Sequence, residues 1–91
     1  MSYIKSNKLN HAISKFIRSM RNRLVQKEDD GWYGWDDEEV CSTQELLDRA
    51  TEKIHQMRIT PTLKDAVDVA NLVMFVASRL DPGKNSEKKT Q

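Results

Sequence analysis

The fold is decided by residues 62–80, which read TLKDAVDVANLVMFVASRL. The segment predicts one long helix that is apolar nearly all round, as buried helices are. Asp65, Asp68 and Asn71 follow at intervals of three, so their side chains lie on neighbouring turns of one face. A buried carboxylate is costly unless it is paired or holds a metal. Two interpretations follow: a narrow wet stripe with Asp65 capping the helix start, or half of a divalent-metal site.

A first helix is predicted over about residues 9–28. Apolar side chains recur there at i, i+3 and i+4 from Leu9 to Leu24, which is typical of an amphipathic helix. The opposite face is basic and includes Arg21 and Lys27. Such a face is either simply solvated or recruits phosphate groups, which Arg and Lys bind well.

A second helix is predicted over residues 43–57. Ser42 and Glu45 fit the S-x-x-E pattern of a capping box at its start. A Pro61-Thr62 turn then leads into the helix of residues 62–80. We therefore predict an all-α fold, a small bundle of three main helices.

Length and composition bound the function. Ninety-one residues with a net charge of +1 predict one small domain, residues 1–80, followed by a disordered polar tail, residues 81–91. The near-neutral balance makes a nucleic-acid or membrane partner unexpected. A single cysteine, Cys41, excludes an internal disulfide. We find no signal peptide, and the longest apolar run, residues 72–77, is too short to span a bilayer, so we expect a cytoplasmic protein.

An acidic and aromatic segment separates the first two helices. Residues 27–40 read KEDDGWYGWDDEEV, and the two glycines predict a loop. Trp32, Tyr33 and Trp35 are too large to lie idle in a polar loop. They either cover the open end of the helical core with their polar tips in water, or form a platform on which a nucleobase stacks.

Candidate metal ligands gather on one side of the second helix. Four of them lie three or four residues apart: Glu45, Asp48, Glu52 and His55. On a surface helix such side chains are usually solvated. If this side faces Asp65 and Asp68, the two sets form an oxygen-rich pocket suited to magnesium or manganese.

The order of these segments resembles the MazG-like, all-α nucleoside triphosphate pyrophosphohydrolases, especially their short phage, viral and archaeal forms. The resemblance covers about residues 12–80 and is carried by GWYGWDDEEV, LLDRATEKI and, most strongly, DAVDVAN with the apolar run after it. It implies divalent-metal-dependent hydrolysis of a (deoxy)nucleoside triphosphate to a monophosphate and pyrophosphate. In the family, acids of an E-E-x-x-E helix and an E-x-x-D helix hold magnesium ions that bridge the triphosphate and activate water.

This chain departs from the family pattern. Asp65 and Asp68 match E-x-x-D, with aspartate in the first place. Thr51, Glu52 and His55 fall on the three glutamates, so only Glu52 keeps a carboxylate. The connection of nine residues between His55 and Asp65 is also short for the family.

The resemblance implies a role for each matching residue. Metal binding and catalysis fall to Glu52, Asp65 and Asp68, with Mg²⁺ or Mn²⁺ as the cofactor. Further ligands to the metal would be Glu45, Asp48 and His55. Substrate contacts fall to a polar and aromatic set: Asn71, Trp32, Trp35, Arg21 and Lys27.

Two functional hypotheses follow. The intact acidic pair of Asp65 and Asp68 favours a nucleotide pyrophosphohydrolase. The lost carboxylates at Thr51 and His55 favour a catalytically inactive nucleotide-binding or protein-interaction module, such as a viral accessory protein. A bundle of only three helices of this length cannot easily cover its own apolar third helix, residues 62–80. We therefore also expect a homodimer or tetramer with the second and third helices at the interface.

Overall fold

The structure is a computed structural model that describes residues 3–80 as three helices joined by a loop and a short turn. Helix α1 spans Asn7–Asp29, α2 spans Thr43–Ile59 and α3 spans Leu63–Arg79. The predicted all-α class is confirmed. The predicted tail, residues 81–91, lies outside the described part of the chain. No helix within the described residues combines the length and apolarity needed to cross a membrane.

A hydroxyl side chain caps the start of each helix. Ser6 Oγ accepts a hydrogen bond from the Leu9 backbone N–H at 3.1 Å, which is why α1 begins before the first apolar residue of its stripe. Ser42 caps α2 in the same way, as the sequence predicts. The cap of α3 is Thr62, and Asp65 instead lies in the first turn, where its charge complements the helix dipole.

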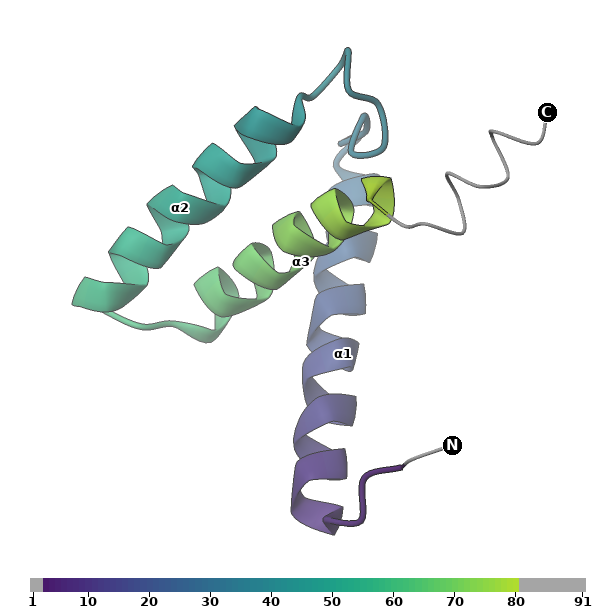
Figure 1. Cartoon of the computed structure of the whole chain (residues 1–91), viewed down its shortest axis with the longest axis vertical. Helices are drawn as coiled ribbons and strands as arrows, with labels where there is room; N and C mark the ends of the chain where they lie inside the picture. Colours follow the sequence, from purple (N-terminus) through teal and green to yellow (C-terminus); the bar gives the residue numbers. More distant parts are fainter. Residues whose placement is uncertain (1–2, 81–91) are drawn as a thin grey trace, which may run out of the picture.

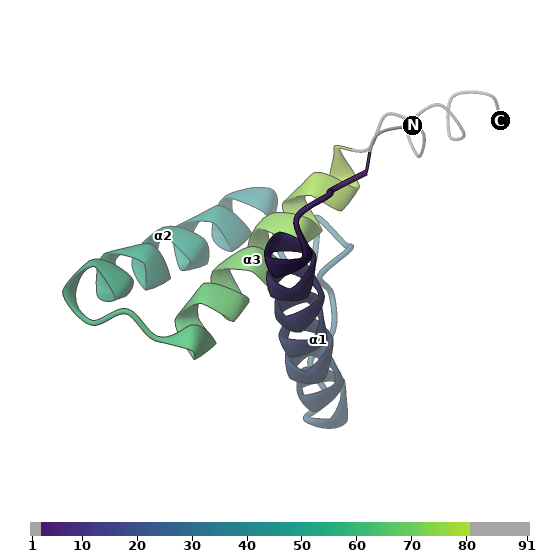
Figure 2. The same ribbon diagram turned by 90° about the horizontal axis from the view of Figure 1, so that it is seen from below.

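Helices α2 and α3 lie side by side as an antiparallel hairpin and share the largest interface in the molecule (Figure 1). Helix α1 crosses α3 at a steep angle (Figure 2), and the hydrogen bonds between the two helices come from Met20 and Arg23 in the C-terminal half of α1. Its N-terminal half extends beyond the other helices, and residues 7–15 are all exposed. The bundle is therefore an open one.

The hydrophobic core is small. It lies between α2, α3 and the end of the α1–α2 loop, and its buried members are Cys41, Leu46, Ala50, Leu72 and Phe75. Leu24 of α1 and Trp32 of the loop pack against it from outside. A core of this size leaves much apolar surface in water, consistent with the open arrangement.

One arginine fixes the loop that carries the aromatic residues. Arg79, at the end of α3, donates hydrogen bonds to the carbonyl oxygens of Trp35 and Cys41, both at 2.7 Å. Its other terminal nitrogen donates to Glu38 Oε2 at 2.6 Å and to Thr43 Oγ1 at 2.9 Å. A planar guanidinium offers donors in several directions at once, so a single side chain ties the loop to both α2 and α3.

The two tryptophans of this loop pack onto the core, whereas Tyr33 is 75% exposed. The ring centroids of Trp32 and Trp35 lie 5.4 Å and 5.2 Å from that of Phe75. Gly34 brings the chain back with a φ of +91°, and an added Cβ there would collide with the Val40 side chain. Both tryptophans therefore cover the helical core, as one of the two interpretations of the sequence expects. Each tryptophan also lines a cavity.

Candidate functional site

A buried carboxylate lies where the three helices meet. Asp68 of α3 is only 3% exposed. Its Oδ1 accepts a hydrogen bond from Arg23 Nε of α1 at 3.0 Å, and its Oδ2 lies 3.3 Å from Lys53 Nζ of α2. The same ammonium lies 3.9 Å from Asp65 Oδ1. Cations from the two other helices thus hold the acidic pair of α3.

These cations also set the ionisation of the carboxyl. Burial on its own raises the pKa of Asp68. The hydrogen bond from Arg23 and the positive charges of Arg23 and Lys53 outweigh that effect, so the pKa lies below its ordinary value of 3.8. Asp68 is therefore ionised at neutral pH and is compensated by protein cations.

The residue of α2 that reaches the acidic pair is Lys53 and not Glu52. Lys53 follows Ala50 by three residues and precedes Met57 by four, so it lies on the face of α2 that packs on α3. Glu52 is rotated from it by about 100° around the helix axis and is exposed. The short connection between His55 and Asp65 does not change which face of α2 carries Lys53 and which carries Glu52.

The other candidate ligands also lie away from the acidic pair. Glu45, Asp48 and His55 are all exposed, and Asp48 accepts a hydrogen bond from Gln44 Nε2 at 2.9 Å. Across residues 3–80, no three His, Cys, Asp or Glu side chains are grouped as a metal site requires. Magnesium or manganese stays a prediction from the resemblance, and the donors as arranged do not fit it, because an ammonium occupies the space beside both carboxylates.

Positive charge exceeds negative charge around Asp68. We define the basic cluster as Arg23, Lys27, Arg49 and Lys53, of which the last three line a cavity of about 60 Å³ together with Asp68. Within residues 3–80, Lys27 and Arg49 form no ion pair. Burial lowers the pKa of Lys27, and the nearby positive charges, chiefly that of Arg23, lower it further. The cavity is therefore electropositive and favours an anionic ligand.

Two predicted substrate residues complete this small cavity. Asn71 is buried, its Nδ2 donates to the Met20 carbonyl at 3.4 Å, and its Oδ1 has no hydrogen-bond partner among the described residues. Trp32 forms one wall, with Lys27 Nζ 5.4 Å from the centre of its ring. The cavity can accept polar atoms, since a space of this size holds at least one water.

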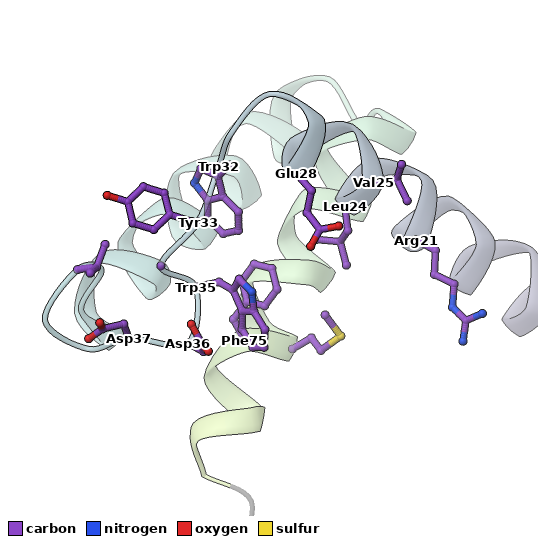
Figure 3. A pocket seen from close by; sticks show the side chains of 13 residues that line it. Arg21, Leu24, Val25, Glu28, Trp32, Tyr33, Trp35, Asp36, Asp37 and Phe75 are labelled. Carbon is purple, nitrogen blue, oxygen red and sulfur yellow. The ribbon is translucent and has the colours of Figure 1, made fainter.

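A larger groove, shown in Figure 3, shares Trp32 and Phe75 with the small cavity. Its volume is about 650 Å³, and its walls come from the C-terminal half of α1, the loop and α3. Trp35, Phe75 and Val25 make it largely apolar, and its charged lining is mostly acidic: Glu28, Asp36 and Asp37 against Arg21. Of the predicted substrate residues, Arg21, Trp32 and Trp35 line this groove, whereas Lys27, Asn71 and again Trp32 line the small cavity.

Two site residues were not predicted from the sequence: Arg49 and Lys53. Lys53 had a signal, because a charge that falls within an apolar stripe at helical spacing must find a buried partner. Arg49 had none, and Arg23 was predicted only as one of several cations on the basic face of the first helix. The crossing of α1 over α3, which brings Arg23 to Asp68, depends on tertiary packing.

No protein-family model, curated protein or solved structure matches this chain. The MazG-like resemblance therefore stays a prediction, and function has to be inferred from the residues of the site.

Proposed function

We propose that the protein binds a (deoxy)nucleotide or a related phosphorylated small molecule, and that it does so without a divalent metal and without hydrolysing the ligand. The observation that carries this proposal is the pairing of Asp68 with Arg23 at 3.0 Å and with Lys53 at 3.3 Å. Protein cations compensate the acidic pair in this arrangement, which is the role that the resemblance assigns to magnesium.

The substitution of an ammonium for a metal removes the chemistry of hydrolysis. A divalent cation neutralises phosphate charge and also lowers the pKa of a bound water, which creates the nucleophile. Lys53 neutralises charge but has no open coordination position for water. Because neither Glu52 nor His55 reaches Asp68, the described residues supply no replacement base beside the pair.

The balance of charge supports a phosphate ligand. Four cationic side chains of the basic cluster face two carboxylates, and Lys27 and Arg49 are left without an ion-pair partner among residues 3–80. Arg and Lys are the side chains that bind phosphate in proteins, through charge-assisted hydrogen bonds. A phosphate at this position would also raise the lowered pKa of Lys27 toward its ordinary value.

The aromatic wall supports a nucleoside. Trp32 borders the small cavity with Phe75 stacked on its ring and the Lys27 ammonium over it at 5.4 Å, so a base would take the place of Lys27 while that ammonium turns to the phosphate. Base stacking on such a face contributes about 1–3 kcal/mol without base specificity. The resemblance adds the nucleotide class, which charge and aromaticity alone do not identify.

Isothermal calorimetry with nucleoside mono-, di- and triphosphates, in Mg²⁺ and in EDTA, tests the proposal beside a pyrophosphate-release assay. We expect binding that survives EDTA, with no release of pyrophosphate. The affinity should fall as the pH rises through the lowered pKa of Lys27, because the ammonium then loses its charge. Lys27→Met should weaken binding roughly 10- to 100-fold, as expected for one charge-assisted contact. The exposed Lys64 provides a matched control, since Lys64→Met should leave the affinity unchanged.

The metal-dependent pyrophosphohydrolase remains the second candidate. It is favoured because Asp65 and Asp68 lie close together: the Lys53 ammonium is 3.9 Å from Asp65 Oδ1 and 3.3 Å from Asp68 Oδ2. It requires the Lys53 ammonium to leave both carboxylates when metal arrives. Pyrophosphate release by the wild-type protein in Mg²⁺ would establish this candidate and overturn the metal-free proposal, and an absence of binding to every nucleotide would overturn both.

A further inference from the structure

The N-terminal half of α1 carries an apolar stripe that nothing in the described residues covers. Leu9, Ile13 and Ile17 recur at intervals of four and are 50%, 38% and 44% exposed. No residue of α1 is fully buried. A helix with an apolar face of this kind normally packs against another element, because its stability depends on that packing.

The charge changes sign between α1 and the loop that follows it. Residues 3–27 contain seven Lys and Arg and no Asp or Glu, whereas residues 28–39 contain seven Asp and Glu and no Lys or Arg. The basic segment includes the exposed stripe. The acidic segment forms the rim of the 650 Å³ groove through Glu28, Asp36 and Asp37. Stripe and groove are therefore both apolar at the centre and opposite in charge around it.

The two surfaces cannot meet within one molecule. The stripe lies on the N-terminal half of α1 and the groove is built around its C-terminal half, where Val25 is about 24 Å along the axis from Leu9 at a rise of 1.5 Å per residue. Figure 1 shows the N-terminal half of α1 pointing away from the loop that forms the groove. The complement of each surface must therefore come from another molecule.

We infer that two copies of this chain associate about a two-fold axis, with their α1 helices antiparallel and each Leu9–Ile13–Ile17 stripe lying along the partner's groove. Antiparallel packing about an axis near the middle of α1 places the basic half of each helix beside the acidic loop of the other. The contact is isologous, so each complementary pair of surfaces is used twice. The inference does not depend on the proposed ligand, because no residue of the basic cluster lines the groove.

The two surfaces supply the parts of a stable interface. Such an interface has an apolar centre and a charged rim, and buries about 1,200–2,000 Å² in total. Two stripes and two grooves supply the apolar centre, and the opposed charges supply the rim. Since much of the attraction is electrostatic and exposed, the dimer should weaken as the ionic strength rises.

Sedimentation velocity of the full chain over roughly 1–100 μM tests the stoichiometry, because an interface of this size typically has a dissociation constant in or below that range. We expect a dimer for the wild type and a monomer for Ile13→Glu. Ile13 is partly exposed in the single chain, so circular dichroism should show unchanged helix content. Leu63→Glu, at an exposed apolar residue of α3, is the matched control and should remain dimeric.

A charge exchange identifies the partner surface. Lys15→Glu with Arg18→Glu makes the stripe acidic, and Asp36→Lys with Asp37→Lys makes the groove rim basic. Each double variant alone should be monomeric, because like charges then meet. An equimolar mixture should form a heterodimer, because both of its contacts are complementary.

Three results would overturn the inference. The first is a wild-type monomer at the highest concentration. The second is an Ile13→Glu protein that dimerises as the wild type does while Leu63→Glu does not, which would place the interface on α2 and α3. The third is a mixture of the two charge variants that stays monomeric although each variant keeps its fold.

Discussion

Replacing Lys53 by methionine tests the energetic role of the buried ion pair. Methionine keeps most of the aliphatic stem of lysine, so the main change is the loss of the ammonium. Asp68 Oδ2, which has no hydrogen bond within the described residues, then also loses its charged neighbour at 3.3 Å. The variant therefore leaves one carboxylate oxygen buried and unpaired, while Arg23 still holds the other.

The size of the effect follows from the burial of both partners. Removing one partner of a fully buried ion pair costs about 3–5 kcal/mol. Lys53 is 32% exposed and Arg23 remains in place, so solvent screening reduces the expected cost to roughly 1–3 kcal/mol. For a domain of this length, that loss lowers Tm by roughly 5–20 °C.

Urea unfolding at pH 7, followed by circular dichroism, measures the change directly. The exposed Lys64 offers the same substitution on α3 without an ion pair among residues 3–80, so Lys64→Met should change the free energy of unfolding by less than about 0.5 kcal/mol. The difference between Lys53→Met and wild type should shrink at low pH, where Asp68 is protonated in both. A Lys53→Met protein as stable as wild type at pH 7 would refute the assignment of Lys53 to the acidic pair.

Three further predictions concern the charge of Asp68 and the loop. Because the pKa of Asp68 is lowered in the folded protein, its ionised form stabilises the fold at pH values above the unfolded pKa of about 3.9. This stability is lost as the pH falls through the pKa of the folded protein. Asp68→Asn should therefore be less stable at pH 7, and its stability in urea unfolding should depend less on pH. Arg79→Lys should cost about 2–4 kcal/mol and increase the solvent exposure of tryptophan fluorescence, because an ammonium cannot replace the two hydrogen bonds to loop carbonyls. Gly34→Ala should cost about 2 kcal/mol or more through its positive φ and its collision with Val40, whereas Gly31→Ala, with a φ of +86° and open space around it, should cost about 1 kcal/mol.

Each of these predictions has a result that contradicts it. Equal pH dependence in Asp68→Asn and wild type would mean that another group controls acid unfolding. Unchanged tryptophan emission in Arg79→Lys would show that the loop is held by its packing on Phe75. Equal losses in the two glycine variants would show that the Val40 contact carries no cost.

The helices could be predicted from the sequence because each signal is local. Hydroxyl caps at Ser42 and Thr62 and apolar spacing of three and four residues determine where helices begin and which faces are apolar. The path of α1 could not be predicted. Its stripe is amphipathic along its whole length, but only the C-terminal half packs on α3 in the single chain.

The part of the site that lies on one helix was also predictable from local signals, and the part contributed by other helices was not. Asp68 and Asn71 were singled out as polar residues on a buried helix, and both are buried. Their partners come from α1 and α2, at separations of 45 residues for Arg23 and 15 for Lys53. The family resemblance places Glu52 beside the acidic pair, whereas the rotation of α2 against α3 decides that Lys53 faces it.

The central claim is that protein cations occupy the place of a divalent metal at the acidic pair. Titration of Mn²⁺ into wild type and Lys53→Glu, followed by calorimetry and by the shift in Tm, tests it most directly. We predict no saturable Mn²⁺ binding to wild type, and binding that raises Tm in Lys53→Glu, where a third carboxylate replaces the ammonium beside Asp65 and Asp68. Tight Mn²⁺ binding to the wild-type protein that is lost in Asp68→Asn would contradict the claim and restore the metal-dependent function.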